Sequence, residues 1–521
     1  MKINPLTHSR RITLILLGNV LFFCLSSWLL PVMFEDNDDA TMAWIASGIY
    51  SGTPDCHLVF INAIYGWLLT LLYRIIPNLE WYSISFAVLH VLSMTVIVDY
   101  WIHKTKDKWV TAGVLLLFYS FWALIIVRFQ FTTTAAMAAF AATLLLLQRK
   151  FGFGGVLLLL ASMVRFSAAG LVGLLMMPAL INEYRIDVKK SYLPFLGIMV
   201  ILLVAHCADD LFYQTPEWQY YKVFNSYRGR INDNPNLWRA VGHLPSDITE
   251  HQFRSVASFA IDPQETSASD LKKIYDCFNN TPLYKKAKNI YPNVIKRYGI
   301  WFLGVTLLFA AAIVICGRRR AWLSYLLLFF FWFGVLSFIS LNGSVKFRVF
   351  LSSLLPILFY ACSALSCMRS TNHMVMKTIA LISVLLFSGE LINNTVHQYI
   401  KVRASQAKMA EQMSLVERSA DYTIISAGAD FSVECFPPFH LSKMITPRKF
   451  INPYCMMASP LNEGFSSFKD LLNGNLVYLA DKHRDFSNYT EGLKVNYDIA
   501  ADTIHLFETE KYALIQINSI E

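Results

Sequence analysis

The sequence lacks the motifs that mark several large classes of enzyme and transporter. It contains no G-x-S-x-G elbow and no Walker A loop, which argues against serine hydrolase chemistry and ATP-driven transport. No Cys/His spacing resembles a zinc site, although there are nine cysteines. The absence of internal repeats disfavours a transporter built from two inverted halves. No basic patch is interleaved with aromatic residues, so the net charge of +9 does not indicate a nucleic-acid-binding protein.

Long hydrophobic runs, by contrast, recur along most of the chain. Hydrophobic residues make up 55% of the 521 residues and aromatic residues 14%, and the mean hydropathy is +0.42. Runs long enough to cross a bilayer, for which about 20 residues suffice, occur from residue 12 to about residue 392. This predicts a polytopic α-helical membrane protein. No A-x-A-like cleavage site follows the first run, Ile12–Met33, which we expect to stay as an anchor.

Basic residues gather in short segments between the apolar runs, which is how a membrane protein sets its orientation. Lys2, Arg10 and Arg11 precede the first run and predict a cytoplasmic N-terminus. The other basic clusters should then also face the cytoplasm: residues 103–108, 149–150, 185–190, 318–320 and 369–377. This arrangement requires an odd number of crossings between residues 34 and 103.

Two apolar runs, 57–76 and 81–102, lie within that interval, so one of them cannot span. The first ends in Arg74 and Pro77 and is predicted to form a helix along the outer membrane surface. The segment Asp39–Tyr50 is predicted to form a second, shorter surface helix. The prediction then totals about eleven spans: residues 12–33, 81–102, 109–127, 131–147, two short helices within 152–182 broken at Arg165, 192–208, 298–316, 322–341, 351–367 and 379–392.

Two large polar regions are predicted outside the membrane, on the side of the C-terminus. Residues 209–295 are rich in aromatic side chains and are predicted to form a helical loop. Residues 396–521 begin with a polar helical stretch, Val402–Ser419, and continue with short β-rich runs at 422–426, 476–480 and 512–517, which predicts a small extracytoplasmic α/β domain. Residues 1–395 would form the transmembrane domain. Cys435 and Cys455 both lie in the C-terminal domain, and a disulfide between them is left open.

The first outer loop, residues 34–80, opens with four acidic residues directly beyond the first span: Glu35, Asp36, Asp38 and Asp39. Carboxylates crowded at a membrane face are costly to keep there unless they accept a proton, hold a cation or orient a substrate. A solvated loop that merely ends the helix is the alternative interpretation.

Further segments occur in a characteristic order. Asp38-Asp39 is followed by ATMAWIASGIYSG and then by VFINAIYGWLLTLLYRIIP, before the span that begins at Trp81. Later come LLLLASMVRFSAAGLVGLLMMPAL, with Arg165 inside it, the basic outer loop NGSVKFRVF and the C-terminal domain. This order resembles the GT-C superfamily of integral membrane glycosyltransferases. The sequence departs from the lipid A aminosugar and mannosyl branches at residues 55–57 (DCH), which replace a Lys-Pro-Pro element, so the acceptor is not carried over.

The resemblance implies an enzyme of the bacterial inner membrane that uses a polyprenyl-phosphate-linked sugar donor. It would transfer the sugar to a glycan, lipid or protein acceptor of the cell envelope on the extracytoplasmic face, by a single inverting displacement. Such a transfer needs a base for the acceptor and cations for the departing phosphate. Asp38 or Asp39 is the predicted base, Asp36 is next, and Glu35 is a substrate-binding candidate. A Mg²⁺ or Mn²⁺ ion bridging Asp36 and Asp38 is an alternative, although most of the resembling family works without metal.

Basic residues near the outer face are candidates for binding the donor. Lys346 and Arg348, two positions apart in an outer loop, are predicted to bind the lipid phosphate, or else to anchor the loop to lipid headgroups. Arg128 is a candidate contact to phosphate or sugar. Arg165 lies between two apolar half-helices and must find a partner, such as an outer carboxylate. His57 is a candidate for orienting the catalytic aspartate or binding the acceptor, although a lone histidine beside an interfacial helix more often has a structural role.

Two other functions are left open. An O-antigen polymerase or ligase would also have about a dozen spans and a large outer loop, but it would depend on outer arginines more than on an early acidic cluster. A lipid-linked-sugar flippase or another transporter would place its ionisable groups within the spans. Here the ionisable groups gather at one face, which favours an enzyme.

Overall fold

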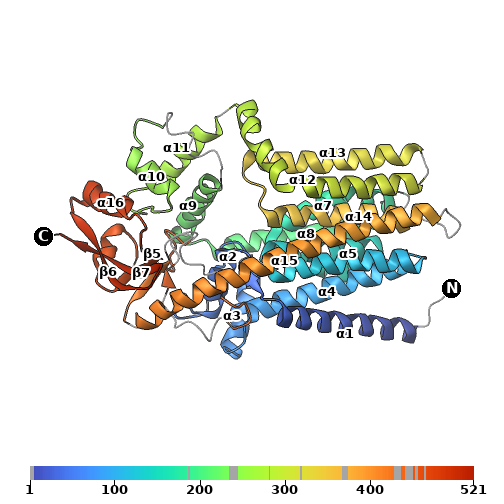
Figure 1. The fold of residues 1–521 in the computed structure, drawn as a ribbon, viewed down its shortest axis with the longest axis horizontal. Helices are drawn as coiled ribbons and strands as arrows, with labels where there is room; N and C mark the ends of the chain where they lie inside the picture. The colour runs from blue at the N-terminus through green and yellow to red at the C-terminus, as the bar shows by residue number, and fades with distance from the viewer. Residues whose placement is uncertain are drawn as a thin grey trace.

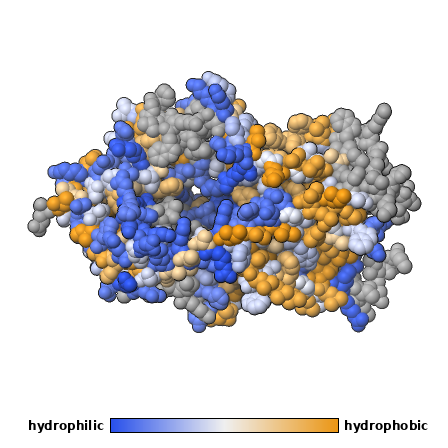
Figure 2. Space-filling view, viewed as in Figure 1, coloured by the Kyte–Doolittle hydropathy of each residue, from blue (hydrophilic) through white to orange (hydrophobic). Residues whose placement is uncertain are grey.

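A bundle of long helices forms one part of the protein, and a five-stranded sheet with short helices lies at one end of it (Figure 1). The bundle surface is mostly hydrophobic, whereas the surface around the sheet is mostly polar (Figure 2). This distribution fits a bundle that lies in a bilayer. The computed structural model describes residues 5–185, 188–233, 244–280, 282–316, 319–366, 374–419, 421–426, 436–440, 450–451, 456–462 and 465–520.

Seven helices of the described ranges are long and apolar enough to cross a membrane. They are α1 (Pro5–Leu29), α4 (Trp81–Lys104), α5 (Lys108–Val127), α7 (Phe151–Tyr184), α8 (Val188–Phe212), α13 (Arg319–Asn342) and α14 (Phe347–Ser366). Three further helices belong to the bundle: α6 (Phe131–Leu147), α12 (Leu283–Cys316) and α15 (Met374–Arg418). The predicted class, a helical multi-pass membrane protein, is confirmed with at least seven apolar spans.

The helix α7 folds back on itself at Arg165. A straight helix of its 34 residues would measure about 50 Å, yet the ring centroids of Phe151 and Tyr184, at its two ends, lie 5.9 Å apart. Arg165 has extended backbone angles (φ −159°, ψ 98°) inside the helix. The predicted pair of short helices broken at Arg165 is therefore confirmed, and the break lies at the end of the bundle opposite to Phe151.

A parallel pair of two-residue strands joins the segments that follow α1 and α5. β1 (Met33–Phe34) follows α1, β2 (Arg128–Phe129) follows α5, and the two pair in parallel. The helices α1 and α5 therefore finish at the same end. We call this the sheet end, because the five-stranded sheet packs there, and we call the other the distal end. The helix α4, which ends at Lys104, runs from the sheet end toward the distal end (Figure 1).

The helix α3 (Ala63–Ile75) is a short amphipathic helix at the sheet end. Its 13 residues span only about 20 Å, too little to cross a bilayer. Tyr73 is buried, whereas Trp67 is 51% and Ile75 66% exposed. The prediction that residues 57–76 do not span is consistent with this helix.

The helix α2 (Asn37–Ser47) corrects a sequence-based expectation. The segment Asp39–Tyr50 does form a helix, but the helix is buried and not exposed on a surface: Trp44 is 0% exposed and packs edge-on against Phe436. The C-terminal region covers it. This covering depends on residues almost 400 positions later in the chain, which the local pattern around α2 does not reveal.

The helix α15 runs from the bundle into the region of the sheet without a break (Figure 1). The sequence predicted a span at 379–392 and a separate polar helix beginning at Val402. The structure joins them in one helix of 45 residues, about 68 Å long. No proline interrupts residues 393–401, so the change from apolar to polar side chains ends the span without ending the helix.

The C-terminal sheet is mixed, with the strand order β4-β3-β5-β7-β6. β3 pairs in parallel with β4 and β5, and β7 pairs antiparallel with β5 and β6. Three of its strands match the predicted β-rich runs, but β6 is an edge strand whose mixed polar sequence gave no such signal. The strands are β3 (Thr423–Ser426), β4 (Phe450–Ile451), β5 (Leu476–Asp481), β6 (Ala501–Glu508) and β7 (Tyr512–Ser519), with η6 (Phe468–Leu472) and α16 (Ser487–Tyr497). Cys435 and Cys455 lie outside the described residues.

The predicted helical loop at 209–295 packs on this C-terminal region. It contains α9 (Pro216–Asn232), α10 (Glu250–Ala257) and α11 (Ala268–Asn279). The carboxylate of Asp262 accepts hydrogen bonds from the backbone N–H of Phe468 at 3.1 Å and from the hydroxyl of Tyr497 at 2.7 Å. These contacts hold the loop and the sheet together above the sheet end of the bundle.

Candidate functional site

The acidic run is positioned by the first turn of α2. Asp36 is the N-cap of this helix, and its carboxylate accepts a hydrogen bond from the backbone N–H of Asn37 at 3.0 Å. Asp38 and Asp39 then fall in the first turn, where the helix dipole favours negative charge. β1, which precedes Glu35, fixes the start of this turn against β2. The local sequence thus places four carboxyl groups around one helix N-terminus.

Arg348 is the central cation of the site. It lies in the first turn of α14, and its guanidinium pairs with Asp36 through Nη1 and lies 3.9 Å from Asp38 through Nη2. The Arg348 side chain is 12% exposed, that of Asp36 31% and that of Asp38 18%. Two predicted site segments, separated by over 300 residues, therefore meet in one partly exposed charged cluster.

Asp38 and Asp39 have different environments, although they are neighbours. Burial, reinforced by the like charge of Asp36, raises the pKa of Asp38 to about 6, while Arg348 opposes the rise. Asp39 is 0% exposed. Its Oδ1 accepts hydrogen bonds from the Tyr82 hydroxyl at 2.9 Å and from the Phe131 backbone N–H at 3.0 Å. Asp39 thus ties α2 to α4 and α6, whereas the Asp38 side chain is still 18% exposed.

Glu35 is paired with the second predicted arginine. Arg128 Nη2 lies 3.2 Å from Glu35 Oε1, and the Arg128 guanidinium also lies over the ring of Phe347 at 5.5 Å. The Glu35 side chain is only 5% exposed, and burial raises its pKa in spite of Arg128. This pair interacts electrostatically with Asp36 and Arg348 of the cluster.

Arg165 has no carboxylate partner within the described ranges, which corrects the expectation of a direct ion pair. Its guanidinium lies 5.3 Å from the ring centroids of both Phe60 and Phe131, and Nη1 donates to the Phe60 carbonyl at 3.4 Å. Its charge interacts with those of Arg348 and Asp38. Most of its N–H donors therefore remain available for an anionic ligand near Asp38.

Three further cations surround the cluster. Lys346 Nζ lies 2.8 Å from a carboxylate oxygen of Asp233, at the end of α9. Arg228, on α9, contributes to the electrostatic field at Asp38, and Arg297, on α12, contributes to that at Glu35. Neither arginine was predicted from the sequence. The polar, aromatic-rich composition of 209–295 was the available signal, but it did not distinguish one basic residue from another.

His57 belongs to a different cluster, at the start of α3. Its Nδ1 lies 2.7 Å from Asp55 Oδ1 and its Nε2 lies 2.9 Å from the carbonyl of Phe212, while its ring stacks on Trp218 at 4.1 Å. Burial lowers the pKa of His57, but the hydrogen bonds, first that to Asp55, outweigh it and raise the pKa to about 10. The cationic ring can thus donate from both nitrogens, and it fastens the segment between α2 and α3 to α8 and α9.

Asp55, Cys56 and His57 are also the one group in the described part of the chain whose possible metal-ligand atoms lie within 4.8 Å of one another. A histidine that donates from both nitrogens has no lone pair for a metal ion. The glycine at position 66 allows this loop to approach α3 closely, because a Cβ there would lie 2.2 Å from the Cys56 carbonyl oxygen. We therefore interpret the group as a hydrogen-bonded clamp.

Comparisons with known proteins give one structural match. No protein-family model matches the chain, and no curated protein sequence matches it. The structure is similar to the crystal structure of ArnT from Cupriavidus metallidurans in the apo state, with 11% sequence identity, a TM-score of 0.41 and coverage of 98% of each chain. ArnT is a GT-C family membrane glycosyltransferase.

Proposed function

We propose that this protein is a membrane glycosyltransferase of the GT-C type. It transfers a sugar from a polyprenyl-phosphate-linked donor to a cell-envelope acceptor, at the membrane face that carries the sheet. The observation that carries the proposal is the cluster of Asp38, Arg348 and Arg165, in which a partly exposed carboxylate lies 3.9 Å from one guanidinium group and interacts electrostatically with a second. A base next to cations is the arrangement that this reaction needs.

Asp38 is the proposed general base. With a pKa of about 6, it is largely deprotonated at neutral pH and still basic enough to accept a proton. In the reaction, a nucleophilic atom of the acceptor attacks the anomeric carbon of the sugar and its proton passes to Asp38. The bond between the anomeric carbon and the phosphate oxygen breaks, and polyprenyl phosphate leaves with the electron pair. The sugar is inverted in this single displacement.

Arg348 and Arg165 are the proposed cations for the leaving phosphate. Guanidinium groups bind phosphate oxygens through paired hydrogen bonds, and they stabilise the charge that develops as the bond breaks. Arg165 suits this role because its ring contacts and its one backbone hydrogen bond leave donors free. Lys346 could join them if the phosphate displaced Asp233, its present partner.

An apolar groove supports a lipid-linked donor. The groove encloses about 590 Å³ between α6, α7 and α8, and its lining runs from Phe166, next to Arg165, to Tyr184. These two residues are 18 positions apart on a helix, about 27 Å, which approaches the thickness of the bilayer core. A polyprenyl chain in this groove would have its phosphate near Arg165.

The proposal does not require a metal ion. The sequence-based alternative was a Mg²⁺ or Mn²⁺ ion between Asp36 and Asp38. Arg348 pairs with Asp36 and lies 3.9 Å from Asp38, so its positive charge already offsets part of the negative charge that would attract such an ion. The alternative stays a prediction that a chelator can test.

The direct test is a transfer assay with the purified protein and labelled polyprenyl-phosphate sugars. An Arg165→Gln variant should raise the KM for the donor by about tenfold or more, since a charge-assisted hydrogen bond contributes about 1.5 to 3 kcal/mol. Arg149→Gln, at the distal end, is the matched control and should leave the KM unchanged. An Arg165→Gln enzyme with the donor KM of the native protein would remove Arg165 from the donor site.

A further inference from the structure

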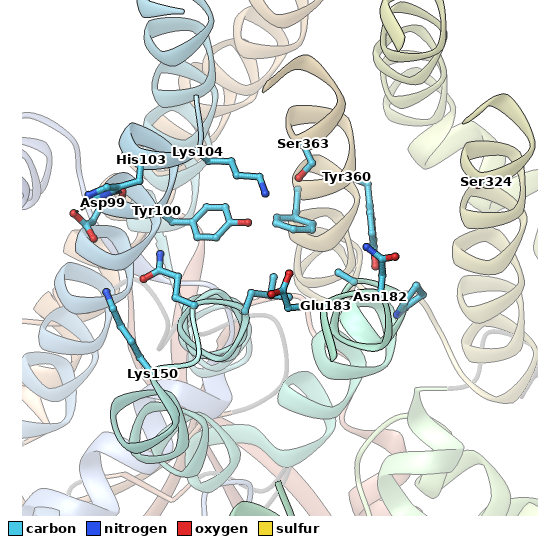
Figure 3. Close-up of a pocket in the computed structure, with 15 residues that line it drawn as sticks. Asp99, Tyr100, His103, Lys104, Lys150, Asn182, Glu183, Ser324, Tyr360 and Ser363 are labelled. Carbon is cyan, nitrogen blue, oxygen red and sulfur yellow. Dashed lines mark hydrogen bonds and ion pairs between the residues drawn. The ribbon is translucent and has the colours of Figure 1, made fainter. Parts of the chain in front are cut away.

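A second polar cavity lies at the distal end, remote from the acidic cluster. It encloses about 860 Å³ and is lined by residues of α4, α6, α7, α13 and α14 and of the α6–α7 turn (Figure 3). Along α4, Tyr82 contacts Asp39 at the sheet end, whereas Lys104 lines this cavity 22 residues later, about 33 Å away. The cavity is thus a separate site, and nothing in the proposed transfer reaction uses it.

The charges around this cavity leave two lysines without a carboxylate partner. Of the carboxylates in its lining, Asp99 pairs with Arg11 at 3.3 Å and Glu183 lies 3.9 Å from Arg149. Lys104 and Lys150 also line the cavity, and no carboxylate in the described ranges pairs with either. Because Arg11 and Arg149 offset the two lining carboxylates, the charged groups that the structure describes in and next to the cavity carry a net positive charge.

Neutral donors complete the lining. The hydroxyl of Tyr100 points into the space between α4 and α14, as does the ammonium group of Lys104 (Figure 3). Neither this hydroxyl nor the side-chain amide of Asn182 has a hydrogen-bond partner in the part of the chain that the structure describes. Ammonium, phenol and amide N–H or O–H groups converging on one cavity are suited to several oxygens of one anion.

We propose that this distal cavity binds a phosphate group, carried by an anionic phospholipid headgroup or by a small soluble ester. Its volume is in the range of small-ligand sites. A lipid could reach it from the side, because Ser324 of α13 is part of its lining and Leu327, one turn further along, is 60% exposed on the apolar surface of the bundle. Basic pockets between spans at the end of a bundle are suited to phosphate headgroups.

The test compares phosphatidylglycerol, diacylglycerol with the same acyl chains and glycerol 3-phosphate as ligands for the purified full-length protein. Native mass spectrometry measures the lipids and titration calorimetry the soluble ester. The double variant Lys104→Gln/Lys150→Gln should bind the phosphate ligand about 30-fold more weakly, taking about 1 kcal/mol for each lysine. Lys106→Gln/Lys108→Gln is the matched control, because it removes the same charge from the neighbouring loop, and it should change the affinity less than about threefold. Tyr100→Phe leaves the charge intact and should weaken binding a few-fold.

The outcomes distinguish three cases: a lipid headgroup, a soluble phosphate ester and the absence of a phosphate site. Binding of phosphatidylglycerol alone supports a lipid headgroup, and equal binding of glycerol 3-phosphate supports a soluble ester. Binding of diacylglycerol as tight as that of phosphatidylglycerol would overturn the proposal. So would equal losses in the two double variants, because the charge effect would then be diffuse.

Discussion

Replacing Arg348 with Gln should move the acid limb of the pH–rate profile to higher pH. In the native protein, kcat/KM should rise with pH through about 6, because the proposed base, Asp38, must lose its proton to act. Arg348 stabilises the deprotonated form, since its Nη2 lies 3.9 Å from Asp38 Oδ2. Without the guanidinium, Asp38 keeps its proton up to a higher pH.

The size of this shift follows from the distance. Two unit charges about 4 Å apart interact by about 4 kcal/mol near a protein surface and about 1 kcal/mol in water. At about 1.4 kcal/mol for each pH unit, the acid limb should move up by about 1 to 3 units. The side chains are only 12% and 18% exposed, which favours the upper half of that range.

The assay is the pH dependence of sugar transfer by purified Arg348→Gln protein at low donor concentration. Lys346→Gln is the matched control, because Lys346 pairs with Asp233 and acts on Asp38 only at longer range, so it should shift the limb less. Both changes should also weaken donor binding. The readout is therefore the pH at which the acid limb lies and not the absolute rate. An unchanged acid limb in Arg348→Gln would refute the assignment of this limb to Asp38.

Three further predictions concern the groove, the clamp and the orientation. Gly173→Leu should raise the KM for a long-chain donor more than the KM for a short-chain analogue. Position 173 lines the groove, and a Cβ there would have no atom within 4 Å, so the new side chain can extend into the groove. Gly18→Leu, on α1 and equally open, is the control. The stabilisation that His57 provides should be fully present below its unfolded pKa of about 6.5 and lost as the pH rises through about 10. The difference in Tm between the native protein and His57→Gln should therefore shrink between pH 7 and pH 10. A constant difference in Tm would contradict the clamp. Lys104→Cys should resist an impermeant thiol reagent added from outside the cell, and its labelling would reverse the predicted orientation.

Local patterns were sufficient to predict the elements whose role is decided by nearby residues. The break at Arg165 was predictable because a guanidinium inside an apolar run must leave the bilayer core, and the surface position of α3 followed from counting crossings between basic loops. The acidic turn at Asp36 was visible because helix N-termini favour carboxylates.

Roles that depend on distant contacts could not be predicted in this way. Asp38 and Asp39 look equivalent in the sequence, and only Tyr82 and Phe131, 43 and 92 positions away from Asp39, make Asp39 a buried tie between helices. His57 was expected near the base, but its partner carbonyl at Phe212 is 155 positions away and holds it in a separate cluster. Long-range pairs of this kind leave no periodic signal in one sequence.

The measurement that tests the central claim most directly is sugar transfer from a labelled polyprenyl-phosphate donor by the purified native, Asp38→Asn and Asp39→Asn proteins, each with and without EDTA. If Asp38 is the base, Asp38→Asn keeps the shape of the side chain but loses the proton acceptor, and the rate should fall by about 100-fold or more. Asp39→Asn should retain most of the rate of the native protein in whatever fraction folds, and EDTA should have no effect. Transfer by Asp38→Asn at the native rate, or loss of transfer on chelation with recovery in Mg²⁺ or Mn²⁺, would contradict a metal-free reaction with Asp38 as its base.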